Sequence, residues 1–494
     1  MPQPMSRHAT DPDIPHVSAW QAGALQAIQA GRPAEGLELL RRVLRAAPSA
    51  EAWSLHGAAR QQLGDLSGAV ASYQAALKLA PDHLPALGNL GFALNECGRF
   101  AEAEAILRRA IGLSPDFAAA WFNLGSVLVR QGRMVEAVDA YAAVLRLQPD
   151  NALALNAIGF PLQETGRMAE AERTLRAALR LAPDMPGAHY NLGMNLLLQG
   201  RYEEGWREYE WRWRVTPPIS APRDFPQPLW DGQPSGARVL LHAEQGLGDT
   251  IQFCRYVPLA AARARVVLEV PAPLTRLLAT LPGVETIVTQ GEPLPDFDFH
   301  CPLLSLPHRF GTTLETVPAA IPYLSAEPAG VARWRDRLAP LPGRRVGLCW
   351  AGNPRAHDLG AHAIDRRRSI TLTSLAPLAA LLNVSFVSLQ KHPPVADAPP
   401  MLPLYDWTAE LHDFADTAAL VAALDLVISV DTAVAHLAGA LGRPVWILNR
   451  FDTCWRWLTD RLDSAWYPTA RLFRQARPGD WDSVVNDLAT TLAG

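Results

Sequence analysis

The chain has 494 residues, 49% of them hydrophobic and 19% charged, so it is long enough for about three domains and too apolar to be intrinsically disordered. Its formal net charge of −4 gives no indication of a basic, nucleic-acid-binding surface. Lys78 and Lys391 are the only lysines, so a fixed cation for a phosphate group has to be an arginine, a histidine or Lys391.

Cysteine usage and the first residues indicate the compartment. The five cysteines are dispersed and form no C-x-x-C pair, which predicts a reducing environment without a disulfide framework or structural zinc. Residues 1–16 are polar and proline-rich, so we expect a disordered tail and not a signal peptide. The uncharged run at residues 372–389 contains Pro377 and Asn383, and we interpret it as helix, turn and strand. These features predict a cytoplasmic protein with no membrane span.

Residues 17–215 contain an internal repeat of 34 residues. Two glycine positions recur at this period, at Gly57, Gly91, Gly125, Gly159 and Gly193 and at Gly64, Gly98, Gly132, Gly166 and Gly200. The spacing and the small-residue positions match the tetratricopeptide pattern of two antiparallel helices per repeat. With a degenerate first copy at residues 19–47 there are about six repeats, which predict an α-solenoid with a concave, partner-binding groove.

One polar position in the repeats suggests a ligand. Asn89, Asn123 and Asn191 precede Leu-Gly in their copies, whereas Leu55 and Ala157 replace asparagine in two others. Here the chain resembles the repeat arm of O-GlcNAc transferases, whose asparagines at this position line the groove and bind the backbone of an acceptor polypeptide. The resemblance implies that the three asparagines are acceptor-binding residues. The alternative is that asparagine is common at this position in repeats of every function.

Aromatic residues and prolines mark the end of the repeats. Trp206, Tyr209 and Trp213 have helical i, i+3, i+7 spacing, which predicts one aromatic face that covers the open end of the array and joins it to the next domain. A platform for a sugar is the alternative. Residues 216–236 are rich in proline, including Pro217 and Pro218, and are predicted to be a linker.

Residues 237–330 are predicted to form an N-terminal Rossmann-like lobe. A strand at 238–243 leads into Gln245, Gly246 and Gly248, whose glycines let the backbone approach a ligand closely. Asp249 comes next, in the first turn of a helix, where it can act as a general base or cap the helix. Further strands are expected at 266–270, 286–288 and 297–303. The Asp-Phe-Asp sequence at 296–298 has the D-x-D pattern of some metal sites, but its alternating apolar context favours a strand.

Residues 331–494 are predicted to form a C-terminal, nucleotide-sugar-binding lobe. A strand at 345–350 is followed by Asn353 and by a charged loop at 357–369, in which Arg368 and Ser369 are candidates for anion binding. Lys391 follows a strand at 385–389, and the carboxyl ends of strands in α/β sheets are where phosphates bind. Asp416 and Thr417 are expected to cap a further helix.

The sharpest signal is the segment at residues 425–444. An apolar run at 426–430 predicts a buried parallel strand, and Asp431 and Thr432 are strong N-cap types before a helix at 433–441. Backbone amides and the helix dipole at such a junction favour a phosphate-bearing ligand. His436 lies one turn into the helix, within reach of a diphosphate. The alternative is a capped helix with a satisfied polar histidine.

Several motifs together resemble a family. They are EQGLGDTIQF at 244–253, WAGNP at 350–354, RRRSI at 366–370, SLQK at 388–391, SVDTAVAHLAGALGRPVW at 429–446 and DSAWYPTARLFRQ at 463–475. They resemble bacterial proteins that join a tetratricopeptide arm to a region similar to glycosyltransferase family 9, the ADP-heptose heptosyltransferases. The resemblance implies a GT-B fold of two Rossmann-like lobes, with Asp249 as the base and with Asp431, Thr432 and His436 in the donor site. Ala433 stands where the family has glycine, and the family's lysine after the second lobe's first strand is missing.

These observations predict an inverting, metal-independent glycosyltransferase without a cofactor. It would transfer a sugar from a nucleotide-diphosphate sugar to an acceptor, for which the repeat groove suggests a protein. Besides Asp431, Thr432 and His436, the expected donor-binding residues are Gln245, Gly246, Gly248, Asn353, Arg368, Ser369 and Lys391. A glycan- or lipopolysaccharide-directed transferase is the alternative within the enzyme class, and a non-catalytic repeat scaffold is the alternative outside it. The sequence does not specify the nucleotide base or the sugar of the donor, the identity of the acceptor, or the oligomeric state.

Overall fold

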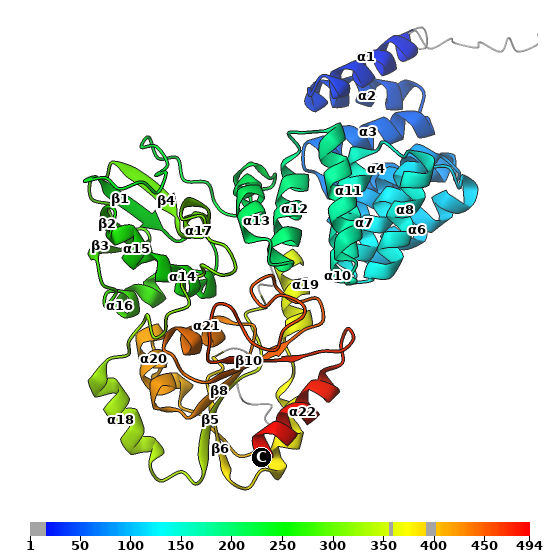
Figure 1. Ribbon diagram of the computed structural model, residues 1–494. Helices are drawn as coiled ribbons and strands as arrows, with labels where there is room; N and C mark the ends of the chain where they lie inside the picture. Colours follow the sequence, from blue (N-terminus) through cyan, green and yellow to red (C-terminus); the bar gives the residue numbers. More distant parts are fainter. Residues whose placement is uncertain (1–15, 355–358, 392–401) are drawn as a thin grey trace, which may run out of the picture. The chain divides into compact units, whose positions relative to one another are not determined.

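The computed structural model describes residues 16–354, 359–391 and 402–494. The chain divides into two compact units, with the division after Thr165. Figure 1 shows helical repeats in blue and cyan, followed by α/β lobes in green to red. In the part of the chain that the structure describes, no helix combines the length and apolar character needed to cross a membrane.

The first unit consists of short helices that pack in consecutive pairs (Figure 1). They are α1(Val17–Gln29), α2(Pro33–Ala46), α3(Ala50–Gln62), α4(Leu66–Leu79), α5(Leu84–Glu96), α6(Phe100–Leu113), α7(Ala118–Arg130), α8(Met134–Leu147), α9(Ala152–Ala157) and α10(Gly159–Glu164). The two series of recurring glycines meet different structural requirements. Gly64 and its equivalents have positive φ, which the turn between paired helices requires. Gly57 lies against the Tyr73 ring, and a Cβ there would come within 2.6 Å of that ring.

The first helix of the fifth copy is broken into α9 and α10. Pro161 has no backbone N–H and therefore cannot donate to the carbonyl of Ala157. The helix is interrupted at Ile158 and resumes at Gly159.

The second unit begins with the remaining repeat helices, α11(Met168–Leu181), α12(Pro186–Leu198) and α13(Tyr202–Tyr209), followed by the 3-10 helix η2(Glu210–Arg214). Trp206 and Tyr209 are buried in one hydrophobic core with residues of the lobes, and the Trp206 ring lies edge-on to Trp455 at 5.1 Å. The predicted joining role of these aromatics is therefore confirmed. Trp213 does not extend the same face, because the α-helix ends at Tyr209.

Residues 216–236 have no helix and only an isolated bridge at Leu229. The segment nevertheless packs on the first lobe. Trp230 is buried, and Arg223 forms an ion pair with Glu269 at 2.8 Å. Phe225 packs against a small cluster that includes Leu240 of the first strand.

The first lobe has a four-stranded parallel sheet in the order β3-β2-β1-β4. Its strands are β1(Arg238–His242), β2(Arg265–Val270), β3(Val284–Thr289) and β4(Phe299–Pro302), and its helices are α14(Leu247–Phe253), η3(Cys254–Tyr256), α15(Val257–Ala261), η4(Ala272–Leu274), α16(Thr275–Leu278), η5(Leu303–Ser305) and α17(Leu306–Arg309). The chain proceeds from β1 to β3 on one side and then places β4 on the other side of β1. The sheet therefore has a switch point between β1 and β4, where ligands bind in open α/β sheets.

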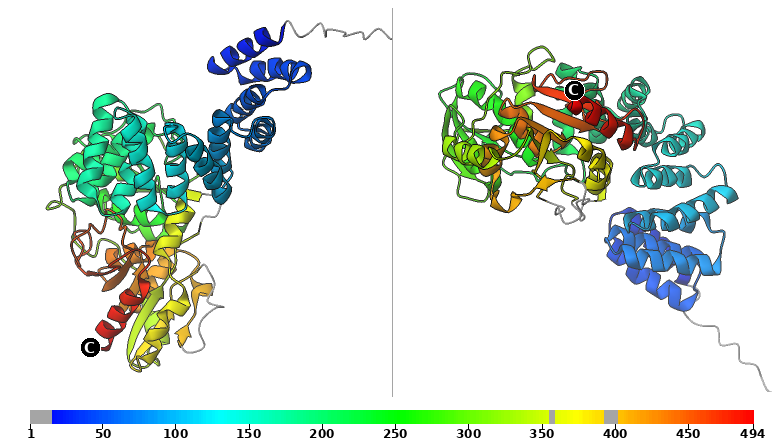
Figure 2. Two further views of the ribbon diagram at one scale, coloured as in Figure 1. Left: turned by 90° about the vertical axis from the view of Figure 1, so that its right-hand side faces the viewer. Right: turned by 90° about the horizontal axis from the view of Figure 1, so that it is seen from below.

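The second lobe has a six-stranded parallel sheet in the order β10-β9-β8-β5-β6-β7. Its strands are β5(Arg344–Cys349), β6(Val384–Ser388), β7(Leu404–Tyr405), β8(Leu426–Val430), β9(Val445–Asn449) and β10(Ala470–Arg474), and its helices are α18(Pro328–Leu338), α19(Leu359–Arg368), η6(Leu372–Ala380), η8(Thr408–Glu410), α20(Phe414–Ala423), α21(Ala433–Ala440) and α22(Trp481–Ala493). Its switch point lies between β5 and β8. Strand β8 is buried throughout, as predicted. The α-solenoid and the α/β class of the C-terminal region are thus confirmed, and Figure 2 shows both from two further sides.

Two local predictions in the second lobe were wrong. The charged segment at 357–369 forms helix α19 from Leu359 onward and is not a loop; its residues 357 and 358 lie outside the described residues. The N-cap of α20 is Asp413, whose carboxylate accepts the N–H groups of Ala415 and Asp416. Asp416 thus lies inside the first turn, where a carboxylate is also favourable, so residue type alone did not fix the helix start.

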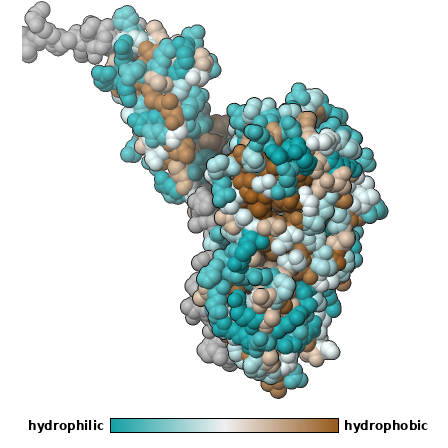
Figure 3. All heavy atoms as spheres, turned by 90° about the vertical axis from the view of Figure 1, so that its left-hand side faces the viewer, coloured by the Kyte–Doolittle hydropathy of each residue, from teal (hydrophilic) through white to brown (hydrophobic). Residues whose placement is uncertain are grey.

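The surface in Figure 3 is hydrophilic over much of the face shown, with an apolar area on its larger body. Exposed large apolar side chains of the second unit include Leu229, Leu259 and Leu462.

Replacement of Gly193 by alanine tests the close packing of α12 on α13. A Cβ at Gly193 would lie 2.7 Å from the backbone nitrogen of Tyr209, so the helices have to separate. We expect G193A to lower the free energy of unfolding by about 1–3 kcal/mol in urea denaturation followed by tryptophan fluorescence. Gly112 in α6 has no atom within 4 Å of its Cβ position, so G112A is the matched control and should gain about 0.5–1 kcal/mol. Equal effects of the two variants would contradict the packing argument.

Candidate functional site

The candidate site lies where the switch points of the two lobes meet. Strand β1 ends at His242 and leads through residues 244–246 into α14, and β8 ends at Val430 and leads through Asp431 and Thr432 into α21. Both loops follow the carboxyl end of a central strand at a switch point.

The N-terminal turns of α14 and α21 are in direct contact. A Cβ at Gly248 would lie 3.0 Å from Cδ2 of His436 and 3.3 Å from Cα of Ala433. Only glycine fits this position without displacing its neighbours. The structure thus brings the two motifs that the sequence singled out, residues 244–253 and 429–446, into one place.

Asp249 is held at both carboxylate oxygens. Oδ2 accepts the backbone N–H of Gly246 at 2.8 Å, which is the helix-capping role expected as the alternative to a base. Oδ1 forms an ion pair with Arg456, whose guanidinium also donates to Gln252 Oε1 at 2.6 Å. Each carboxylate oxygen has a second lone pair, so both contacts leave Asp249 able to accept a further proton donor.

Arg456 joins the two lobes at this point. Its side chain is mostly buried and lies over the Trp455 ring, with the guanidinium carbon 4.2 Å from the ring centre. Burial alone lowers the pKa of Arg456, but the Cys454 thiol and the Asp249 carboxylate raise it above the ordinary arginine value. A permanent positive charge is therefore fixed beside Asp249.

His436 is buried in the protein interior and is not exposed at the end of the sheet. Its Nδ1 is 2.9 Å from the Tyr467 hydroxyl, its Nε2 is 3.8 Å from Asp431 Oδ1, and its ring stacks on Trp457. Burial lowers the pKa of His436 to about 4, although Asp431 opposes the shift. The imidazole is therefore neutral at pH 7, and its role in donor binding stays a prediction.

Arg368 connects α19 to the loop after β8. Its Nη1 donates to the backbone carbonyl of Asp431 at 3.1 Å, and its Nε donates to Asp365 at 3.0 Å. Ser369 accepts the N–H of Gly352 at 3.0 Å, in the loop after β5. The segment predicted to bind anions thus contacts both loops of the switch point.

Thr432 begins α21 with extended backbone, and its side chain does not cap the helix. Its hydroxyl lies 2.9 Å from Ser429 Oγ and 3.6 Å from Cys349 Sγ. Thr432 therefore provides no side-chain cap for α21, and the amide of Ala435 donates to the Thr432 carbonyl at 3.1 Å instead. Uncapped amides at a helix N-terminus are the groups to which anions bind in proteins.

Three other predicted donor residues lie around this centre. Gln245 donates through Nε2 to the Tyr209 hydroxyl at 3.0 Å. Lys391 is exposed, and its ammonium group donates to the carbonyl of Leu411. Asn353 is exposed shortly after β5. The role of these three residues in donor binding stays a prediction.

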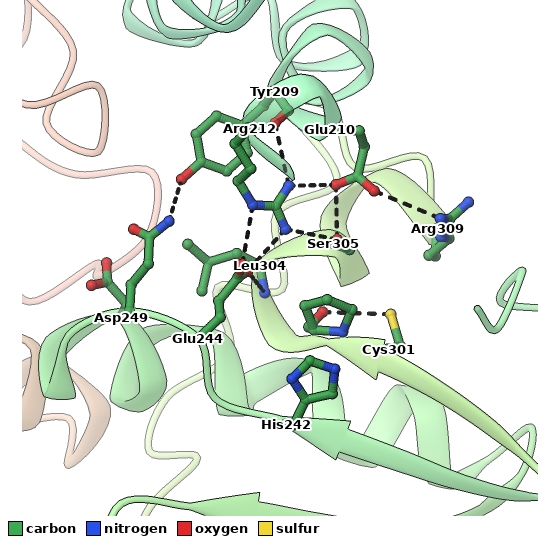
Figure 4. A network of polar contacts seen from close by, with 12 residues as sticks. Tyr209, Glu210, Arg212, His242, Glu244, Asp249, Cys301, Leu304, Ser305 and Arg309 are labelled. Carbon is green, nitrogen blue, oxygen red and sulfur yellow. Dashed lines mark hydrogen bonds and ion pairs between the residues drawn. The ribbon is translucent and has the colours of Figure 1, made fainter. Parts of the chain in front are cut away.

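A buried polar network supports the loop after β1 (Figure 4). Arg212 forms an ion pair with Glu244 at 2.9 Å and donates to Ser305 Oγ at 2.8 Å. It also pairs with Glu210 at 2.7 Å, and Glu244 accepts the N–H of Leu304. The residue directly before the glycine loop is therefore anchored to the segment that ends the repeats.

The three predicted acceptor-binding asparagines are half-buried and lie in different units. In the first unit, Asn123 donates to the carbonyl of Gly88 in the preceding repeat at 3.1 Å. It also lines a hollow of about 240 Å³ with Phe122, Gln148 and Asn151. Asn89 lies in the same unit and Asn191 in the second. Asn123 therefore joins two neighbouring repeats, and its role in peptide binding stays a prediction.

Within the part of the chain that the structure describes, the acidic, histidine and cysteine side chains do not gather into a metal site. Among residues 16–354, 359–391 and 402–494, no three of them are grouped to hold an ion. Asp298 of the D-x-D sequence instead accepts the backbone N–H of Arg238 at 2.8 Å.

Comparison with known proteins finds similar sequences in both halves of the chain. The tetratricopeptide repeat family matches residues 22–83, 96–152 and 162–209, and a second tetratricopeptide family matches residues 61–113. Glycosyltransferase family 9 (heptosyltransferase) matches residues 411–448. Protein FlbA of Caulobacter vibrioides is 31% identical over an alignment of 318 residues, and the alignment covers 58% of this chain and 52% of FlbA. The chain thus spans about half the length of this curated relative.

Solved structures similar to the chain include MamA (residues 41 to the end) from Desulfovibrio magneticus RS-1, with 21% identity, a TM-score of 0.31 and coverage of 34% of this chain and 96% of MamA. PilF of Pseudomonas aeruginosa has 21% identity and a TM-score of 0.37, and the match covers 42% of this chain and 95% of PilF.

The family matches confirm that the chain combines tetratricopeptide repeats with a C-terminal segment similar to glycosyltransferase family 9. That segment extends from just before α20 to within β9 and includes Asp431, Thr432 and His436.

Sequence reasoning did not single out three residues of the site. Glu244 directly precedes the glycine loop and Gln390 directly precedes Lys391, so both lie inside the motifs that carry the family resemblance. Gln390 accepts the N–H groups of Trp350 and Ala351 and thereby fixes the loop after β5. Arg456 lies between two tryptophans and has no motif signal, so only the fold could reveal it.

The buried neutral His436 predicts a pH dependence of stability. Its pKa falls from 6.5 to about 4 on folding, so between these pH values the unfolded chain binds a proton that the folded chain does not. The stability linked to this difference in proton binding is fully present above pH 6.5 and is lost as the pH falls toward 4. The loss amounts to about 1.4 kcal/mol per pKa unit, or roughly 3 kcal/mol in all. We expect His436→Gln to remove that part of the pH dependence in urea unfolding, whereas His412→Gln, at an exposed site, should retain it. Parallel pH profiles for the two variants would show that His436 titrates normally.

Proposed function

We propose that the chain is an inverting, metal-independent glycosyltransferase that transfers a sugar from a nucleotide-diphosphate sugar to a polypeptide. One observation supports this most: the first turn of α14, which bears Asp249, contacts the N-terminal turn of α21, the helix that lies in the family 9 match. A carboxylate and a helix N-terminus thus lie on elements that contact each other, which supports a site where one activates the acceptor and the other binds the donor.

The donor diphosphate is proposed to bind at the N-terminus of α21. The amides after Thr432 have no side-chain cap, and the helix dipole favours negative charge there. Arg368 already bonds to the carbonyl of Asp431, so its positive charge lies beside this end. Arginine offsets diphosphate charge by charge-assisted hydrogen bonds, which is the basis for transfer without a metal ion. Gln245, Gly246, Gly248, Asn353, Ser369, Lys391 and His436 complete the proposed donor site.

Asp249 is proposed to act as the general base. It takes the proton of the acceptor hydroxyl as the oxygen forms a bond to the anomeric carbon. The bond from that carbon to the diphosphate oxygen breaks on the opposite face, and the nucleoside diphosphate leaves with the electron pair, so the configuration inverts. Arg456 acts as a positioning residue because it holds the Asp249 carboxylate.

The acceptor is proposed to be a protein held by the repeats, including Asn89, Asn123 and Asn191, because tetratricopeptide arrays bind polypeptides in their grooves. A glycan or lipopolysaccharide acceptor is the alternative for the same chemistry. A non-catalytic scaffold is favoured by a different observation: Asp249 is ion-paired, and His436 is buried against protein groups.

Nucleotide binding separates a donor site from a scaffold. We expect one of UDP, GDP, ADP, CMP and dTDP to raise the melting temperature of the full chain, because a ligand that binds only the folded state stabilises it by mass action. The shift should be unchanged by EDTA. No shift with any nucleotide at millimolar concentration would favour the scaffold, and a shift abolished by EDTA would contradict metal independence.

Asp249→Asn tests the proposed base. We expect kcat to fall by at least about 10²-fold, while nucleotide binding in the thermal assay is retained. Asp487→Asn is the matched control, since Asp487 is exposed on α22. Unchanged transfer by D249N would remove Asp249 from the mechanism without affecting the nucleotide-binding result.

A further inference from the structure

The second repeat differs from the later repeats at two positions of its first helix. His56 and Arg60 of α3 occupy positions at which the third to sixth copies have leucine or isoleucine. Those eight apolar residues are all buried: Leu90, Leu94, Leu124, Leu128, Ile158, Leu162, Leu192 and Leu196. Polar groups in place of packed leucines lower the stability of the fold unless their hydrogen bonds are satisfied. Their presence at these two positions therefore indicates a role other than packing.

These residues line an open hollow of about 670 Å³ between α2, α3 and α4, entirely within the first unit. Arg41 and Arg45 come from α2, and Trp53, His56 and Arg60 come from α3. The α4 side has only small residues, such as Gly68 and Ala71, which leave the space open.

The hollow has more hydrogen-bond donors than protein acceptors. Arg60 pairs with Asp65 at 3.0 Å through Nη1, but its buried Nε has no acceptor among the described residues. Within the same described part of the chain, Arg45 donates through Nε to the carbonyl of Arg41 at 3.2 Å, and its two terminal nitrogens remain open to a ligand. Arg41 pairs with Glu38 at 2.5 Å. Burial, and then Arg60 and Arg41, lower the pKa of His56 to about 4 against the opposing effect of Asp65, so the imidazole is neutral. Because Arg41 and Arg60 are paired with carboxylates, Arg45 gives the hollow its excess positive charge.

The hydrogen bond at Nδ1 of His56 determines whether the other ring nitrogen, Nε2, donates or accepts. The Ser72 hydroxyl donates its only hydrogen to the carbonyl of Gly68 at 2.7 Å. Ser72 therefore accepts at its oxygen from Nδ1 of His56, 2.9 Å away. In the neutral imidazole Nε2 is then an acceptor. The site thus presents guanidinium groups for an anion and one acceptor for an N–H group.

We propose that this hollow binds an acidic peptide segment, with carboxylates on Arg45 and Arg60, a backbone N–H on His56 Nε2, and an apolar side chain against Trp53. Guanidinium groups match carboxylates in a bidentate manner. His56 Nε2 and the Trp53 indole can also contact an N–H group and an apolar side chain. Inorganic phosphate has neither group, so it cannot make these contacts. Binding here requires no transferase activity, so the inference is independent of the proposed reaction.

The test is fluorescence anisotropy of the full chain at low salt. The probe is a fluorescein-labelled hexapeptide with three aspartates around one leucine and an amidated C-terminus. The double variant His56→Leu and Arg60→Leu installs the residues that the later repeats bury, so it should fold, as checked by circular dichroism. We expect it to bind the probe at least about tenfold more weakly.

A second pair of variants keeps the test decisive if the double variant does not fold. Arg45→Ala should weaken binding several-fold, whereas Arg146→Ala, the next-to-last residue of α8 as Arg45 is of α2, should leave it unchanged. An asparagine version of the probe should not bind, and a free-acid version shows whether a terminal carboxylate adds affinity. Equal binding by the asparagine probe, equal loss in both arginine variants, or displacement of the probe by equimolar inorganic phosphate would overturn the proposal.

Discussion

The buried ion pair between Arg212 and Glu244 is the interaction on which the arrangement of the second unit depends. Arg212 is 1% exposed and Glu244 2%, so each charge has lost nearly all contact with water. Such a pair is tolerated because hydrogen bonds to Ser305, Leu304 and Glu210 satisfy the remaining donors and acceptors. Removal of one partner alone would leave an uncompensated buried charge, at a cost of about 3–5 kcal/mol. The last segment of the repeats is thereby fixed to Glu244, the residue directly before the glycine loop.

A second constraint is the meeting of two helix N-termini. The positive ends of α14 and α21 would repel each other at van der Waals distance. Asp249 in the first turn of α14 and Asp431 just before α21 place negative charge at both ends, and Arg456 and Arg368 lie beside them. The charges near the junction thus alternate. The contact between the two helix ends is therefore maintained by charged groups of the protein itself.

The sequence predicted the elements whose signals are local. The apolar run at 426–430 is β8, and the 34-residue period gave the helix pairs, because strand burial and repeat spacing depend on neighbouring residues alone. The start of α20 was missed because Asp413 and Asp416 are both good residues for a helix N-terminus. Arg456 could not be found, since its partner Asp249 is more than 200 residues away. Likewise, no local pattern shows that His436 is enclosed by Trp457 and Tyr467.

The burial of Trp206 and Tyr209 among lobe residues determines where the chain can be divided. A fragment that begins at the proline-rich segment would lose these rings and Arg212 together, and would expose Phe253, Trp455 and Trp466 to water. A fragment that begins at Gly166 keeps the compact second unit whole. The final repeat helices therefore belong physically to the α/β region, although their sequence belongs to the repeats. Exchange of repeat arms between related proteins could preserve the lobes only if it leaves these helices in place.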